Sequence, residues 1–165
     1  MNKAYMLAVL LMLPFTGCID FLEDEVNGIE EYEGYCQEDL IIEYNDYDGC
    51  QFELDFKQTV EIKWWIDLPD AESSEEIDIY FIDEDNIYDY REGRDWWSGE
   101  CEEFVYKEEV SREYVHNETL QRQVELLEGK WYFIVDNTDC TGAQPYDDVR
   151  TQYYVEMRFD RYTEE

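Results

Sequence analysis

The residues best suited to chemistry are the five cysteines and the single histidine of this 165-residue chain. The cysteines are Cys18, Cys36, Cys50, Cys101 and Cys140. Setting Cys18 aside leaves four, an even number that in an exported chain predicts two disulfides with three possible connectivities. We favour Cys36–Cys50, a local clip across a short acidic loop, and Cys101–Cys140, which would join two loops flanking the C-terminal strands. Buried free thiols are the alternative. Zinc is disfavoured because the chain lacks a C-x-x-C pair.

Catalytic chemistry has little support in the residue pattern. His116, in "YVHNET", is the one histidine, and no G-x-S-x-G motif supplies a serine nucleophile to go with it. Paired carboxylates could hydrolyse glycosides, but among 44 acidic residues some pair always has a plausible spacing. We therefore expect no enzyme, and we expect His116 to lie on the surface.

Calcium binding is the more reasonable inorganic chemistry, since calcium takes carboxylate and carbonyl oxygens as ligands. Asp136, Asn137 and Asp139 in "DNTD" fall at the end of a predicted strand and form the best candidate site. None of the acidic turns matches the twelve-residue EF-hand loop. Solvated turn residues are the competing interpretation.

Two adjacent tryptophans offer a binding chemistry. Trp96 and Trp97, in "RDWWSGE", fall in a predicted loop, where they could stack on sugar rings or enter a partner's pocket. Alternatively, at least one covers the edge of the core near Cys101. Asn117, in "NET", matches the N-glycosylation acceptor pattern, which matters only if the host glycosylates exported proteins.

The first 17 residues predict export. "MNKAYMLAVLLMLPFTG" has a lysine near its start and then an almost wholly apolar run, as in a secretory signal peptide. The run is shorter than the roughly 20 apolar residues that span a bilayer. The "FTGC" that closes it resembles the lipobox of prokaryotic lipoproteins, although Phe15 stands where leucine is usual. The resemblance implies that Cys18 is the first mature residue and carries a diacylglycerol-type anchor, whose two chains hold a protein stably to a membrane.

The charge excludes one class of partner. The formal net charge is -32, from 44 acidic and 12 basic residues. Nucleic acid is therefore excluded as a natural partner, because binding phosphates needs a basic surface. Such self-repulsion destabilises a compact fold unless salt screens it. The net negative charge is consistent both with a solubilising surface and with a halophilic adaptation to saline surroundings.

The elements that position these residues are predicted to be strands. Apolar residues alternate with polar ones in "TVEIKWWID", "EIDIYFID", "KWYFIVDN" and "QYYVEMRFDRY", which is typical of half-buried antiparallel strands. "LQRQVELL" alternates as a strand too, whereas the stretch from Cys101 to about residue 119 is ambiguous. We expect an all-β fold, an antiparallel sandwich of about seven or eight strands over residues 50–165. Residues 18–49 are read as an acidic tether (19–35) with a disulfide loop; a short helix in the tether is the alternative.

The last third of the chain resembles a known family. "VELLEGKWYFIVDNTDCTGAQPYDDVRTQYYVEMRF" is similar to the end of the bacterial pre-peptidase C-terminal domain, and "EIDIYFIDEDNIYDY" resembles its central strand and following turn. The resemblance covers roughly residues 50–160 and is a strand pattern without a catalytic motif. It implies a jelly-roll-like β-sandwich, generally non-catalytic, found on secreted enzymes or alone at cell surfaces.

These observations together predict a lipid-anchored, outward-facing protein of the cell membrane with a non-catalytic binding or structural role. A surface protein or a polysaccharide is the expected partner. The main alternative is a carbohydrate- or calcium-binding module that uses Trp96, Trp97 and the acidic loops, and a secreted hydrolase is the third possibility.

Overall fold

The computed structural model describes residues 29–72, 75–92, 104–138 and 142–162. Residues 30–161 form one compact unit. Residues 1–29 and 162–165 form a second unit, nearly all of which lies outside the described residues.

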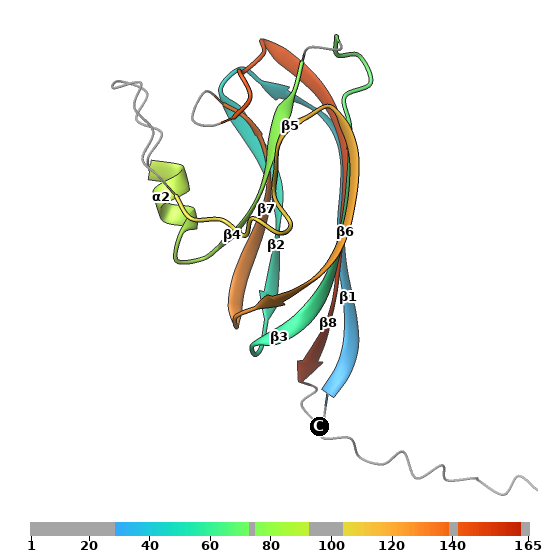
Figure 1. Ribbon diagram of the computed structural model, residues 1–165, viewed down its shortest axis with the longest axis vertical. Coiled ribbons are helices and arrows are strands. Elements are labelled where there is room, and N and C mark those ends of the chain that lie inside the picture. Colours follow the sequence, from blue (N-terminus) through green and yellow to red (C-terminus); the bar gives the residue numbers. More distant parts are fainter. Residues whose placement is uncertain (1–28, 73–74, 93–103, 139–141, 163–165) are drawn as a thin grey trace, which may run out of the picture. The chain divides into compact units, whose positions relative to one another are not determined.

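The described residues form eight strands and one short helix (Figure 1). Their bounds are β1 Ile29–Glu43, β2 Asp46–Leu54, β3 Gln58–Asp67, β4 Ile77–Asp83, α2 Ile87–Glu92, β5 Arg112–Val115, β6 Asn117–Leu126, β7 Gly129–Asn137 and β8 Asp148–Tyr162. The strands make two four-stranded sheets with the orders β1-β8-β3-β6 and β2-β7-β4-β5. The first strand thus pairs with the eighth, the second with the seventh, the third with the sixth and the fourth with the fifth. This nested order is that of a jelly roll, and it confirms the predicted antiparallel sandwich.

The core lies between the sheets and follows the predicted alternation. On β3, every second residue from Val60 to Ile66 is at most 1% exposed. On β8, the inward set from Tyr153 to Phe159 is likewise buried. Burying one face of each strand in this way stabilises the sandwich by roughly 25 cal/mol for every Å² of apolar surface removed from water.

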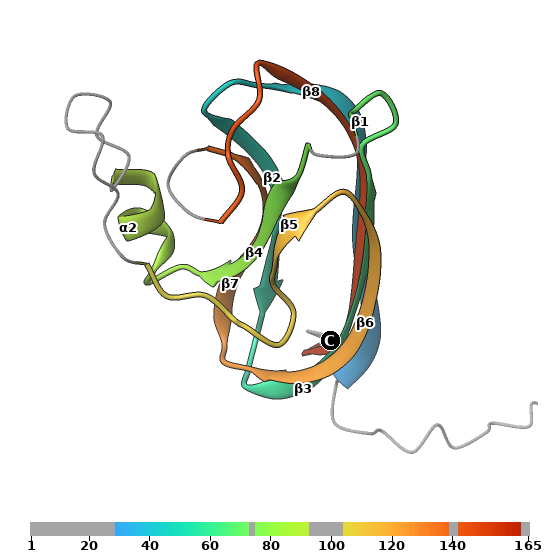
Figure 2. The same ribbon diagram turned by 45° about the horizontal axis from the view of Figure 1, so that its top comes forward.

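The β2-β7-β4-β5 sheet departs from simple alternation, because part of its outer face is also buried. The alternation predicted for this strand would place Asp78 and Tyr80 on the solvent side of β4, but they are only 1% and 0% exposed. Helix α2 and the segment around Phe104 cover this side of the sheet, as Figures 1 and 2 show for the helix. Tyr80 packs edge-on against Phe104 with 5.0 Å between ring centroids. Tyr90 of α2 packs edge-on against the same Phe104 ring, also at 5.0 Å. Because β4 is covered on both faces, its residues are buried on both sides and its burial does not follow the predicted alternation.

The sandwich also begins earlier than residue 50, the expected boundary. β1 and β2 occupy most of the segment that was read as tether and disulfide loop, and each forms the edge of its sheet. The predicted Cys36–Cys50 disulfide is present and joins these two edge strands, with 6.3 Å between the Cα atoms. Charged residues are a common protection of edge strands, so the acidity of β1 is compatible with a strand.

Candidate functional site

The outer face of the β1-β8-β3-β6 sheet is left open by the described segments. Helix α2 lies on the side of the other sheet in both Figure 1 and Figure 2, and none of the described helices or loops crosses this one. Outward-pointing side chains of four neighbouring strands therefore share one surface there. We call it the open face.

Three aromatic side chains stand side by side on the open face, one from each of three adjacent strands. Trp65 on β3 lies directly opposite Tyr154 on β8 in the strand register. Tyr154 in turn lies beside Tyr35 of the edge strand β1, with ring centroids 6.4 Å apart and planes inclined by 22°. Tyr35 is 70% exposed, and the other two are partly exposed. We call Tyr35, Tyr154 and Trp65 the aromatic row.

The middle ring of the row is held by a hydrogen-bonded chain along β8. The Tyr154 hydroxyl donates to Glu156 Oε2 at 2.8 Å, and the other oxygen of Glu156 accepts from Arg158 Nε at 2.6 Å. Burial and the bond to Glu156 raise the pKa of Tyr154 to about 12. The bond from Tyr154, together with the charge of Arg158, lowers the pKa of Glu156. At neutral pH the phenol therefore stays protonated and the carboxylate ionised, which keeps this ring fixed.

Arginines balance part of the negative charge on the open face. Arg158 lies 3.8 Å from Glu33 in addition to its pair with Glu156. Arg150 binds both oxygens of Asp39 at 3.1 Å and lies 3.3 Å from Asp70. The bond to Arg150 lowers the pKa of Asp39. These pairs are exposed and contribute little to stability, but they make the open face less negative than its carboxylates alone would.

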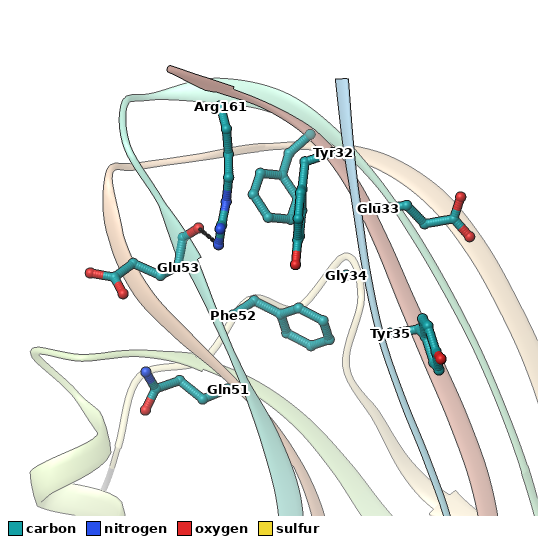
Figure 3. A pocket seen from close by; sticks show the side chains of 9 residues that line it. Tyr32, Glu33, Gly34, Tyr35, Gln51, Phe52, Glu53 and Arg161 are labelled. Atoms are coloured by element: carbon teal, nitrogen blue, oxygen red, sulfur yellow. Dashed lines mark hydrogen bonds between the residues drawn. The ribbon is translucent and has the colours of Figure 1, made fainter. Parts of the chain in front are cut away.

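A hollow of about 340 Å³ opens beside this face, between β1 and β2 (Figure 3). The Arg161 guanidinium lies 4.1 Å from the centre of the Tyr32 ring, and Arg161 Nη2 donates to the Glu53 carbonyl at 3.4 Å. A cation over an aromatic face is attracted by the ring quadrupole. Figure 3 shows Tyr35 and Glu33 pointing to the opposite side of β1 from Tyr32 and Phe52. Tyr35 lines the hollow as well, but its side chain points to the open face.

Asn137, one of the predicted calcium residues, is engaged in structural bonds. Asn137 is 1% exposed. Its Nδ2 donates to the carbonyls of Glu43 at 3.0 Å and Tyr146 at 2.9 Å, and its Oδ1 accepts from the Tyr146 backbone N–H at 2.9 Å. Asn137 thus fastens the end of β1 and the loop before β8 to the end of β7, and its side-chain oxygen is already used. Asp139 lies outside the described residues.

Asp136 belongs to a second buried arrangement. It is 2% exposed and lies opposite Asp78 across the β4–β7 ladder. Asp78 accepts hydrogen bonds from the backbone N–H of Tyr114 at 2.9 Å and of Ala143 at 3.0 Å. Tyr114 has a positive φ of 62°, which the bulge between β4 and β5 accommodates. Burial raises the pKa of Asp78, while the two backbone hydrogen bonds act in the opposite direction. In the described part of the chain, no group of three or more His, Cys, Asp or Glu residues is placed to hold a metal ion.

The other predicted sites are scattered. His116 lies at the corner between β5 and β6, half-buried, with Nδ1 2.8 Å from the Glu75 carbonyl oxygen. Asn117 is exposed at the start of β6, and its Nδ2 donates to Asp67 Oδ1 at 2.9 Å. The remaining predicted residues lie outside the described ranges: Cys18, Trp96, Trp97, Cys101 and Cys140.

The aromatic row was not singled out from the sequence, although the signal for it was present. Trp64 is 0% exposed, and strict alternation along β3 therefore directs Trp65 to the opposite face. Tyr154 was expected to face outward, and Tyr35 lay in the predicted tether. What the sequence could not supply is the strand order that places these residues on neighbouring strands.

Comparisons with known proteins add no relative. No family model matches the chain, and no curated protein sequence matches it. The resemblance to the pre-peptidase C-terminal domain therefore stays a prediction. In the described part of the chain, no helix has the length and apolar character needed to cross a membrane.

Proposed function

We propose that this protein is a non-catalytic binding domain anchored by a lipid on Cys18 to the outer side of the cell membrane. The open face is its binding surface. The observation that carries this proposal is the aromatic row, because Tyr35 and its neighbours remain in contact with solvent, whereas α2 and the segment around Phe104 cover part of the opposite outer face. Exposed aromatic side chains that lie together are typical of interaction sites.

The cysteines support the export part of the proposal. The Cys36–Cys50 disulfide joins the two edge strands, and disulfides persist in oxidising, extracytoplasmic surroundings. The apolar segment before Cys18 supports the same location. The formal charge of -32 supports surroundings in which salt screens repulsion between carboxylates.

Lipid labelling of the full-length chain in a prokaryotic host with lipoprotein processing tests the anchor. Cells are fed a clickable fatty acid, and the chain is compared with its Cys18→Ser variant. We expect the label and membrane retention in the first and neither in the variant. The matched control is Cys36→Ser, which must keep the label because it leaves the signal segment unchanged.

Protease added to intact spheroplasts then tests orientation. We expect the anchored protein to be digested without lysis. Label that persists in Cys18→Ser, or protection from protease until the cells are lysed, would overturn the proposal.

A further inference from the structure

We propose that the aromatic row binds an uncharged polysaccharide chain that runs across β1, β8 and β3. The inference rests on the proposed function, since it names the ligand class of the open face. It uses residues other than Trp96 and Trp97, which the sequence suggested for sugar binding.

The geometry of the row suits a linear chain of sugar rings. Its three side chains come from adjacent strands, roughly 5 Å apart, so the row runs across the strands over about 10 Å. The Tyr35 and Tyr154 planes are inclined by only 22°, and Trp65 continues the line directly opposite Tyr154. Aromatic faces carry partial negative charge, and the C–H groups on one side of a pyranose ring can pack against them.

The width of the row argues against a protein partner. The strand positions on either side of each ring carry polar or charged side chains: Glu33, Gln37, Lys63, Asp67, Gln152 and Glu156. The aromatic surface is thus one side chain wide. Protein interfaces centre on a broader, fully buried apolar patch, whereas an extended polymer can lie along a narrow strip.

The charge of the open face selects an uncharged ligand. The overall charge of -32 repels acidic polysaccharides. A basic partner would have to compete with Arg150 and Arg158, which already pair with carboxylates on this face. A neutral chain requires neither pairing to be broken.

Amide side chains supply the polar contacts that hydroxyl groups need. Gln121 lies opposite Lys63 and Gln123 lies opposite Glu61, and both amides are exposed on β6. Gln37, two residues after Tyr35, is also exposed on the outward side of β1. An amide both donates and accepts hydrogen bonds, as a sugar hydroxyl does. These groups lie beside the row and can fix the orientation of a stacked sugar.

Affinity electrophoresis of the detergent-solubilised full chain tests the inference. Native gels would contain hydroxyethylcellulose, galactomannan, dextran or xylan as uncharged probes, and alginate or polygalacturonate as anionic ones. We expect at least one uncharged polymer to retard the protein and the anionic ones not to. Tyr35→Ala and Trp65→Ala should each raise the apparent dissociation constant about tenfold, because each removes one stacking surface.

Two further variants separate a binding role from a structural one. Trp65→Phe keeps an aromatic face and should retain most of the affinity. Tyr88→Ala removes a tyrosine of α2 that is 64% exposed, away from the open face, and should bind normally. Tyr35 is so exposed that its loss should leave the unfolding temperature unchanged, which keeps the test valid if Trp65→Ala is unstable.

Retardation by none of the uncharged polymers would overturn the inference. So would equal retardation of Tyr35→Ala and the unchanged chain, or binding to the anionic polymers alone. Loss of binding in Tyr88→Ala would overturn it by placing the ligand on the other sheet. Since anchoring through Cys18 is measured separately, each of these results is distinguishable from failure of the proposed function.

Discussion

Replacing Asn137 by alanine should destabilise the fold severely, because one buried side chain fastens three segments. Its amide makes three hydrogen bonds of 2.9–3.0 Å, to Glu43 and to both backbone groups of Tyr146, and a longer one of 3.4 Å to the Ile42 carbonyl. Each such bond contributes about 1 kcal/mol net, and buried groups left without a partner cost more. We expect the free energy of unfolding to fall by about 3 kcal/mol, and the unfolding temperature to fall by roughly 10 °C for a chain of this size.

Urea and thermal unfolding, each with and without millimolar calcium, would measure the effect. If Asn137 acts through these bonds, the loss is the same in both conditions. If it were a calcium ligand, the loss would depend on calcium, because a ligand of the native state raises stability by mass action. Asn117→Ala is the matched control: it removes one exposed bond and should cost about 0.5 kcal/mol or less. A loss below about 1 kcal/mol for Asn137→Ala, or one seen only with calcium, would refute the reasoning.

Three other perturbations follow from the same structure. Replacing Cys36 and Cys50 together by serine should lower the free energy of unfolding by about 3 kcal/mol, because the crosslink closes a short loop with a sequence separation of 14; an unchanged urea midpoint would contradict this. Gly49→Ala should lower the free energy of unfolding by roughly 3 kcal/mol, because a Cβ there would overlap the Phe133 carbonyl oxygen of β7. Gly34→Ala should lower it by less than about 1 kcal/mol, because a Cβ there would come closest to a side chain, that of Phe52, at 3.1 Å. Equal losses in thermal unfolding would count against this packing. Burial raises the pKa of Asp78 above its ordinary value of 3.8. As the pH rises above about 3.8, the Asp78 carboxyl therefore ionises in the unfolded chain before it does in the native state, and the native state loses stability. Asp78→Asn should lack this loss, and parallel stability–pH curves for the two proteins would disprove the assignment.

Much of the sandwich could be predicted because its strands bury one face in a regular way. The alternation around Trp64 and around Val155 predicted half-buried strands, and the apolar residues expected to face inward are buried. The Cys36–Cys50 pairing was predicted from an even cysteine number and a short spacing, and it is present. A local crosslink of this kind can be inferred because its partners are close in the sequence as well as in space.

The features missed are those that depend on the partners a segment meets. The first part of β1 was read as tether because residues 19–35 are acidic and aperiodic, yet an edge strand tolerates charge on its exposed side. Asp78 looked like a solvent-facing residue, since nothing local indicated that α2 would cover its sheet. The role of Asn137 depends on Glu43 and Tyr146, which only the strand order brings to it. Long-range arrangement of this kind is invisible to periodicity.

Both outer faces, as well as the core, contribute to the 17% of the chain that is aromatic. On one face, Tyr80 and Phe104 are packed under α2, where burial stabilises the fold by roughly 1.5–3 kcal/mol for each large apolar side chain. On the open face, Tyr35 has kept 70% of its surface in water and has gained little of that energy. Stability therefore accounts for the first group and leaves the second without a structural reason. Tyr35 is exposed beside Tyr154, whose hydroxyl is held by Glu156. The free energy of burying the Tyr35 ring is therefore still available to a ligand that covers it.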